Sequence, residues 1–277
     1  MADQLDRCTK AGTSYLTGGE GPTLLFLHGI PGSALTWEVV AARLQEQYWV
    51  IVPDLRGFGQ SDPPGDDYYM EGQARAIREL LDALDVTDCG LVTHDFGGPV
   101  GLTMMRLFPD LEIRELVLSD TNVFTDTYVP PPLRLAKIPL VNTVFFQLMV
   151  GNRFGLRMLY RGAVKEKETA PWSNFQQHLT PSGMAMTRRI FQRSLADLEE
   201  NYEAIERMLP DIQNRTLILW GDSDPFFSTA VGERMRAAIA DAELIVFDET
   251  GHFVPEERPM DVAAAILTFY SPEQSEP

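Results

Sequence analysis

The chain has 277 residues, of which 44% are hydrophobic, and it carries a formal net charge of −17. This length and apolar content can supply a packed core for one large domain or two modest ones, which excludes a disordered or fibrous chain. The acidic excess repels phosphate backbones and anionic lipid, so we expect neither a nucleic acid nor a membrane among the partners.

Targeting signals and reactive thiols are not expected. The longest apolar runs fall well short of the roughly 20 residues that span a bilayer. The N-terminal segment MADQLDRCTKAGTSY lacks the apolar stretch of a secretory signal. We therefore expect a cytoplasmic protein. Cys8 and Cys89 do not have a metal-like spacing, and we expect both to be reduced thiols, with Cys89 near the core.

A regular alternation of short apolar runs and helical stretches begins at residue 23. Before it, Gly18, Gly19 and Gly21 suggest an N-terminal hairpin. Short buried strands that alternate with amphipathic helices predict βαβ units and a mostly parallel sheet covered on both faces. The apolar runs are TLLFLH, WVIVPD, GLVTHD and RELVLSD, and the helical stretches between them are SALTWEVVAARLQEQ, EGQARAIRELLDAL and GPVGLTMMRLF.

The alternation stops after Asp120. Residues 121–208 contain helical stretches but no strand-like run, and the strand pattern returns with RTLILWGD and ELIVFDETGH. We therefore predict a core formed by residues 1–120 and 209–277, with residues 121–208 inserted as a helical cap. A cap over the carboxyl ends of parallel strands lies where an α/β sheet places its ligand site.

Acidic and histidine residues follow several of the predicted strands. Loops that follow the strands of one parallel sheet gather at one edge, so these residues are expected to be neighbours. Along the chain, a candidate acidic nucleophile comes first, then an acid, then a histidine, which is the order of an α/β-hydrolase triad. The residues are His28, Asp95, Asp120, Asp224 and His252.

Five motifs in this order resemble those of the α/β-hydrolases over nearly the whole chain: HGIPG, DLRGFGQSD, THDFGG, WGDSDPF and GHFVPEERP. The resemblance implies an α/β-hydrolase fold, a mostly parallel sheet flanked by helices with an inserted helical cap. At the elbow, Thr93 and Gly97 occupy the small-residue positions on either side of the nucleophile, Asp95. The chain contains no GxSxG, which disfavours an ordinary serine esterase.

An aspartate at the elbow predicts displacement at a saturated carbon, because a carboxylate is a poor nucleophile toward acyl groups. The product is an alkyl ester of Asp95, which water activated by His252 would hydrolyse. Asp224 would orient the imidazole, although Asp120 occupies the position of the acid in one branch of the family. The resemblance implies that the backbone N–H groups of Ile30 and Phe96 hold the oxyanion.

Aspartate elbows are typical of haloalkane dehalogenases and epoxide hydrolases, and the leaving group distinguishes the two. An epoxide oxygen needs a proton donor, which in that family is usually a pair of lid tyrosines. The corresponding positions in this chain carry Phe145 or Phe146 and Phe191, which weakens the epoxide interpretation. Other tyrosines in the predicted cap are Tyr128, Tyr160 and Tyr202.

The resemblance therefore favours haloalkane dehalogenase-type hydrolysis, with epoxide hydrolysis as the alternative and an inactive ligand-binding fold as a third interpretation. Two signatures of haloalkane dehalogenases are missing, a tryptophan at Phe96 and an asparagine at Ile30. Trp172 is a candidate donor of an indole N–H to a halide. We expect a small apolar substrate and water, no cofactor or metal, and a monomer or homodimer. The expected substrate-binding residues are Phe145, Phe146, Trp172 and Phe191.

Overall fold

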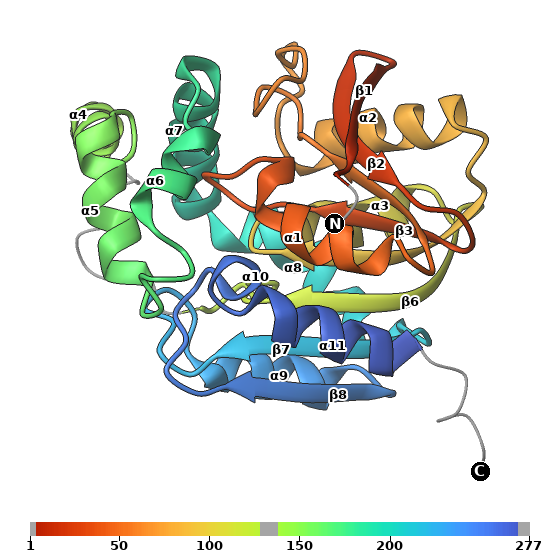
Figure 1. The fold of residues 1–277 in the computed structure, drawn as a ribbon. Coiled ribbons are helices and arrows are strands. Elements are labelled where there is room, and N and C mark those ends of the chain that lie inside the picture. The colour runs from red at the N-terminus through yellow and green to blue at the C-terminus, as the bar shows by residue number, and fades with distance from the viewer. Residues whose placement is uncertain (1–3, 128–137, 271–277) are drawn as a thin grey trace.

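The computed structural model describes residues 4–127 and 138–270. Within these residues, one sheet of eight strands has the order β1-β2-β4-β3-β5-β6-β7-β8. Strands β3 to β8 run parallel to one another, and β2 pairs antiparallel with both β1 and β4 (Figure 1). The predicted α/β-hydrolase fold with a mostly parallel sheet is confirmed. The strands are β1 (Asp6–Lys10), β2 (Thr13–Gly18), β3 (Thr23–Leu27), β4 (Trp49–Pro53), β5 (Asp88–His94), β6 (Glu112–Ser119), β7 (Arg215–Gly221) and β8 (Ala242–Phe247).

Helices cover both faces of the sheet, which is why its central strands read as continuous apolar runs. In β3, Leu25 and Leu27 point into one hydrophobic core, whereas Leu24 and Phe26 point into the other. The first core includes side chains of α2, α3 and α9, and the second includes side chains of α1 and α11. The helices are η1 (Ala34–Trp37), α1 (Glu38–Leu44), α2 (Met70–Ala83), α3 (Gly97–Leu107), η4 (Leu209–Asp211), α9 (Thr229–Ala238), α10 (Val254–Glu257) and α11 (Pro259–Tyr270).

The N-terminal hairpin exists, but its turn differs from the prediction. Strands β1 and β2 pair from Asp6–Thr17 to Lys10–Thr13, so the chain reverses at Ala11 and Gly12. Both turn residues have positive φ angles, 48° and 73°, as a two-residue hairpin turn requires. The glycines at 18, 19 and 21 instead connect β2 to β3.

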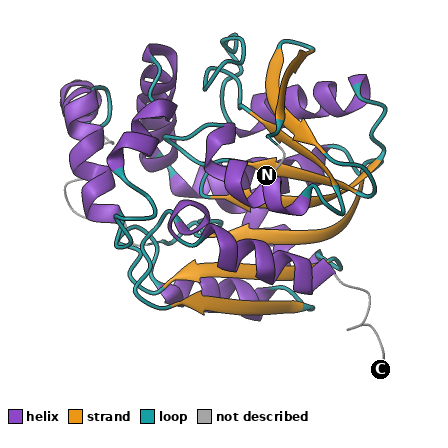
Figure 2. Cartoon of the chain, viewed as in Figure 1, coloured by secondary structure: helices purple, strands orange, loops and turns teal. Residues whose placement is uncertain are grey.

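Between β6 and β7 the chain forms helices, of which α4 to α7 lie together at one side of the molecule (Figure 1 and Figure 2). Side chains of α4, α5 and α6 pack in a hydrophobic cluster that includes Phe146, Leu156 and Phe175, whereas Tyr202 and Ile205 of α8 belong to the first core of the sheet. These helices fall in the segment predicted as the cap, of which Tyr128 lies outside the described residues. In the described part of the chain no helix has the length and apolar character needed to cross a membrane. The helices are α4 (Pro139–Met149), α5 (Arg153–Ala163), α6 (Trp172–Phe175), η3 (Gln176–His178), α7 (Pro181–Ala196) and α8 (Leu198–Met208).

Candidate active site

Asp95 occupies the tight turn between the end of β5 and the start of α3. Its φ angle is 48°, a left-handed conformation that costs a non-glycine residue about 1–3 kcal/mol. Two glycines make the turn possible, because a Cβ on Gly97 would collide with the Leu27 carbonyl and a Cβ on Gly29 would collide with Asp95 itself. The motif THDFGG therefore presents a carboxylate at the carboxyl edge of the sheet.

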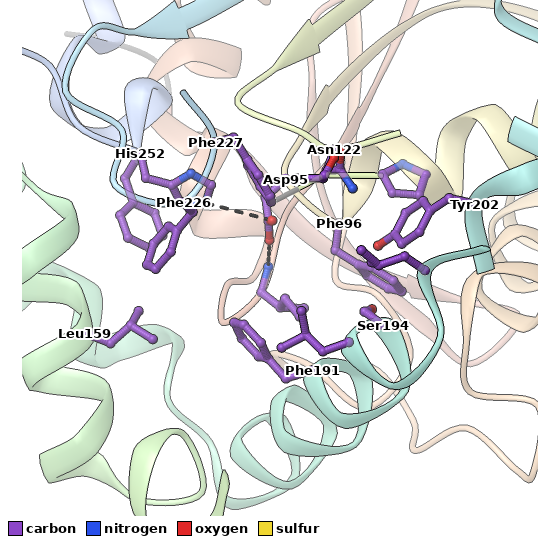
Figure 3. A pocket seen from close by; sticks show the side chains of 16 residues that line it. Asp95, Phe96, Asn122, Leu159, Phe191, Ser194, Tyr202, Phe226, Phe227 and His252 are labelled. Atoms are coloured by element: carbon purple, nitrogen blue, oxygen red, sulfur yellow. Dashed lines mark hydrogen bonds and ion pairs between the residues drawn. The ribbon is translucent and has the colours of Figure 1, made fainter. Parts of the chain in front are cut away.

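The two oxygens of the Asp95 carboxylate have different neighbours. Oδ2 accepts a hydrogen bond of 2.7 Å from the backbone N–H of Ile30, and the N–H of Phe96 also binds the carboxylate. Oδ1 lies 3.9 Å from His252 Nε2, which is too far for a direct hydrogen bond. Oδ2 is thus held by a backbone donor, while Oδ1 lies within ion-pair distance of His252, as the dashed lines in Figure 3 show.

Asp224 orients the imidazole of His252. Its Oδ2 lies 2.9 Å from His252 Nδ1, and its Oδ1 accepts hydrogen bonds from the backbone N–H groups of Phe226 and Phe227. Phe226 and Phe227 also place their rings 4.9 and 5.8 Å from the imidazole ring. The segment 220–227 therefore fixes both the acid and the imidazole, whose Nε2 lies 3.9 Å from Asp95 Oδ1.

Asp120, the rival acid, has other partners. It is fully buried, its Oδ1 accepts from the N–H of Gly221, and its Oδ2 accepts from the hydroxyl of Ser119. Burial and the nearby Asp224 hold the pKa of its carboxyl well above the usual range. The hydrogen bond to the imidazole is made by Asp224, and Asp120 makes none to this ring.

Charges in the site are strongly coupled. Burial raises the pKa of Asp95, whereas His252 and the N–H groups of Ile30 and Phe96 oppose this rise. Burial lowers the pKa of His252, but the attraction of Asp224, its hydrogen bond, and the charges of Asp95 and Asp120 together raise it to about 9. The acidic groups around His252 therefore favour the protonated form of the imidazole in the resting site.

A cavity of about 110 Å³ opens above Asp95, between the sheet edge and the cap. Most of its wall is apolar, which fits a small apolar ligand. Few polar side chains line the cavity around Asp95: those of Asn122, Thr127, Ser194, Tyr202 and His252. The lining residues are Ile30, Asp95, Phe96, Pro99, Asn122, Thr127, Leu159, Phe191, Ser194, Leu195, Leu198, Tyr202, Phe226, Phe227, His252 and Phe253.

Of the four aromatic residues predicted to bind substrate, the cavity lining includes Phe191 alone. Phe146 is buried within the cluster that the cap helices share, and Phe145 packs against that cluster. Trp172 packs against Tyr160 and Phe175. The expectation that Phe145, Phe146 and Trp172 line the site was wrong, because the apolar face of a cap helix can bury against its neighbours as well as against a ligand.

The side chains of Ser194 and Tyr202 line the cavity, opposite His252 in the view of Figure 3. Tyr69 and Ser194 form a hydrogen bond of 2.8 Å, and Tyr202 interacts with both hydroxyls. Burial and the negative charge of Asp95 raise the pKa of Tyr202 to about 12, against the opposing effect of the Ser194 and Tyr69 hydrogen bonds. Tyr202 is thus a protonated phenol within the electrostatic reach of the nucleophile.

The cap is anchored to the loop that carries His252. The backbone N–H of His252 donates to the Ala163 carbonyl at the end of α5. The carboxylate of Glu257, in α10, accepts from the N–H groups of Gly251, Lys165 and Glu166 at 3.1, 2.6 and 2.9 Å. Because Lys165 and Glu166 follow α5, Glu257 connects the cap directly to the histidine loop.

The remaining motifs fix the loop that carries Ile30. His28 donates from Nδ1 to the Gly29 carbonyl and accepts from the N–H of Leu55 at Nε2. The buried carboxylate of Asp54 accepts from the N–H of Ala34 at 2.7 Å. The segments HGIPG and DLRGFGQSD therefore brace each other, which keeps the Ile30 N–H aimed at Asp95.

The sequence pattern of the alpha/beta hydrolase family matches residues 24–265. The chain belongs to the alpha/beta hydrolase family. Human epoxide hydrolase 4 is 26% identical to this hydrolase over 275 residues, which cover 94% of this chain and 75% of the relative. The cis-3-alkyl-4-alkyloxetan-2-one decarboxylase of Shewanella oneidensis is 27% identical over 276 residues, which cover 92% and 84% of the two chains.

Solved structures support the same fold. A loop variant of the haloalkane dehalogenase from Bradyrhizobium elkanii matches this hydrolase with a TM-score of 0.79 and 19% identity, covering 96% of this chain and 95% of that one. At this identity the likeness shows the shared fold alone. Fold and family therefore establish a hydrolase, and the reaction has to be argued from the site.

Several residues that line the cavity were not given a role in the site from the sequence. Phe226 is the last residue of the quoted motif WGDSDPF and Phe227 follows it, and Tyr202 was noted as a cap tyrosine without a role. Ser194 and Asn122 carried no signal that separates them from ordinary surface or turn residues. His178, to which the sequence analysis gave no role, is buried, with its Nδ1 2.8 Å from the Ser33 hydroxyl.

Proposed function

We propose that this hydrolase cleaves its substrate through a covalent alkyl ester on Asp95. The geometry around residue 95 supports this proposal: one oxygen is held by the Ile30 N–H, and the other faces the cavity. Oδ1 attacks a saturated substrate carbon, forms the new C–O bond and expels the leaving group. A neutral ester then replaces the carboxylate.

Hydrolysis follows at the carbonyl carbon of that ester. His252 Nε2 takes a proton from water, and the resulting hydroxide adds to Cγ of Asp95. The negative charge that develops on Oδ2 is already opposite the N–H groups of Ile30 and Phe96. Collapse of this intermediate breaks the ester bond, releases the alcohol and restores the carboxylate.

The ester itself prepares His252 for this second step. In the resting site the Asp95 charge contributes to the raised pKa of His252. Esterification removes that charge, so the pKa of the imidazole falls and its neutral, basic form becomes populated. Asp224 keeps the ring oriented throughout.

Tyr202 favours an oxygen leaving group, and an epoxide is the substrate class we propose first. Its protonated phenol lines the same cavity as Asp95, where it can donate its proton to the ring oxygen as the C–O bond breaks. The resulting tyrosinate regains a proton from solvent before the next turnover. The sequence favoured a haloalkane over an epoxide, because phenylalanines occupy the expected positions of the lid tyrosines. The proposal reverses this order because Tyr202, on α8, lines the cavity. A carbon–halogen substrate remains the second candidate, since the wall is mainly apolar and a halide leaves without a proton.

A paired assay distinguishes the two substrates. The enzyme is incubated separately with styrene oxide and with brominated alkanes, and diol and bromide are quantified. We expect diol formation, and Tyr202→Phe should lower its rate by about 10²-fold or more, the scale of general acid catalysis. Ser173→Ala, on the exposed surface of the cap, is the matched control. Bromide release that is unaffected by Tyr202→Phe, without any diol, would reject the epoxide assignment in favour of the dehalogenase one.

A further inference from the structure

The outer surface of the helical pair α4–α5 exposes large apolar side chains. Val144 and Leu148 on α4 are 58% and 67% exposed, and Phe154 and Met158 on α5 are 76% and 56% exposed. Each pair is spaced four residues apart, so each forms a stripe along its helix. The two helices lie side by side at the outer edge of the molecule (Figure 1), and they contact each other. Exposed apolar groups gathered in this way mark an interaction surface.

A basic stripe runs beside the apolar one on α5. Arg153, Arg157 and Arg161 are all exposed and recur every four residues. None of them forms an ion pair with a carboxylate in the described residues. Arg157 lies over the ring of the partly exposed Trp172 at 5.8 Å. Uncompensated arginines beside apolar side chains give this helix an amphipathic outer face.

Charge is segregated in this hydrolase. Residues 138–152 carry no charged side chain, and residues 153–167 carry five basic residues against one acidic residue, although the whole chain has a net charge of −17. The expectation that no membrane is bound rested on that overall charge. Locally, the α4–α5 face is positive, so an anionic surface attracts this face while it repels the rest of the molecule.

The face is separated from the cavity by one helix. Leu159 of α5 lines the cavity, and the adjacent Met158 is exposed on the outer side. An apolar substrate concentrates in lipid, so a lipid surface against α5 would bring the substrate next to the cavity wall. A second copy of this chain fits less well, because a two-fold dimer through the same face would set the unpaired arginines of both copies against each other.

We propose that the α4–α5 face docks onto an anionic lipid surface, with the apolar stripes inserted among the acyl chains and the arginines at the headgroups. Trp172, beside Arg157, lies at the level where indole rings favour the membrane interface. The helices lie flat on the surface and do not cross it. The proposal concerns binding alone and stands whatever leaving group Asp95 expels.

Vesicle cosedimentation tests the proposal with the full chain. Vesicles of phosphatidylcholine alone are compared with vesicles containing about one third phosphatidylserine, at about 0.1 M and about 0.5 M salt. We expect binding to the anionic vesicles that weakens at high salt. Replacing Arg157 and Arg161 together by glutamine should lower the partition coefficient roughly 10- to 30-fold, because each basic residue near the surface contributes about fivefold.

Matched substitutions outside the face serve as controls. Leu148→Ser with Phe154→Ser should reduce binding strongly, whereas Met260→Ser, which is 57% exposed on α11, should not. Arg43→Gln, on α1, is the control for charge. Circular dichroism checks that each variant is folded. Equal binding to both kinds of vesicle, no binding to either, or dimers in sedimentation velocity that the same substitutions abolish would each overturn the proposal.

Tryptophan quenching gives a second measurement that locates the contact. Trp37 and Trp220 are fully buried. The partly exposed Trp49 lies in the core sheet on β4, where its indole N–H donates to the Thr17 hydroxyl. Quenching by brominated lipid in anionic vesicles should therefore arise mainly from Trp172. Trp172→Phe should remove most of the quenching while leaving vesicle binding largely in place. Quenching that persists in Trp172→Phe would place the membrane contact on another face and contradict the proposal.

Discussion

In the proposed mechanism the carboxylate of Asp95 supplies both the nucleophile and the carbonyl whose oxygen becomes the oxyanion. In a serine hydrolase the enzyme supplies the first and the substrate the second. With a serine nucleophile, the oxyanion forms on the substrate and reaches the backbone donors only in the reaction. Here Oδ2 already accepts from Ile30 at 2.7 Å in the resting site, and in the proposed mechanism the carbonyl that water attacks belongs to Asp95 itself. The donors can therefore be preorganised without a substrate, which lowers the cost of building charge on that oxygen.

Replacing His252 by glutamine should separate the two steps. Attack by Asp95 does not need a base, whereas hydrolysis of the ester depends on the imidazole. We expect His252→Gln to lose turnover by about 10²- to 10⁴-fold and to accumulate one substrate-derived adduct on Asp95, which intact-protein mass spectrometry measures after incubation with substrate.

The double variant Asp95→Ala/His252→Gln is the control and should carry no adduct. If His252→Gln kept full turnover, the imidazole would not be the base. If the wild-type protein turned over no substrate and the variant trapped none, the ligand-binding interpretation of the sequence would be preferred.

The elements of the site are held together across a long separation in sequence. His252 lies on the loop after β8, yet its backbone N–H donates to Ala163 at the end of α5. Glu257 adds contacts to Lys165 and Glu166 on one oxygen and to Gly251 on the other. A displacement of α5 therefore moves the acceptor of the His252 N–H, so the position of α5 and that of His252 are coupled.

Glu257→Gln should slow hydrolysis of the ester more than its formation. The amide keeps the size of the side chain but replaces one accepting oxygen by a donor, so at least one of the three backbone N–H groups loses its partner. An unsatisfied buried donor costs about 1–3 kcal/mol, and we expect a lower Tm together with a roughly tenfold slower decay of the covalent adduct in single-turnover experiments.

Glu168→Gln, an exposed carboxylate that follows the same segment, is the matched control and should change neither step. A decrease of both rates by the same factor in Glu257→Gln would instead indicate a general loss of folded protein. In that case Glu257 would be a stabilising residue without a specific effect on His252.

The sheet and the residues at its edge could be predicted because their signals are local. Short apolar runs mark β3 and β5, and the turn chemistry of THDFGG marks the elbow. The cap could not be resolved in the same way. Helical periodicity shows that Phe146 is on an apolar face, but the same pattern serves a helix packed on its neighbours and a helix packed on a cavity. The place of Tyr202 depends on how α8 meets α3, which no local pattern specifies.

At the scale of the whole molecule, the histidines are confined to the interior. All four histidines, His28, His94, His178 and His252, are buried. His94 donates from Nε2 to the His252 carbonyl, and burial holds its pKa well below the usual range. Burial also lowers the pKa of His28. Apart from His252, the histidines of the folded chain are therefore neutral, whereas in the unfolded chain they bind protons below a pKa of about 6.5.

His178 offers the clearest test of this distribution. Burial, with a smaller contribution from His28, lowers its pKa to about 3. Its neighbour Glu256, 3.6 Å away, has a pKa that burial raises to about 8. At neutral and acid pH Glu256 is therefore largely protonated and offers no negative charge to a protonated His178.

The pKa of His178 is lower in the folded than in the unfolded chain, so the unfolded chain binds the proton first as the pH falls. The contribution of His178 therefore lowers stability as the pH decreases from about 6.5 to about 3. From pH 7 to pH 5 this histidine should remove about 2 kcal/mol from the free energy of unfolding. His178→Gln keeps a polar side chain beside Ser33 without a titrating group. Urea titrations at both pH values should therefore show that the variant loses about 2 kcal/mol less than the wild type over this interval, and equal losses in the two proteins would mean that His178 is protonated in the folded chain.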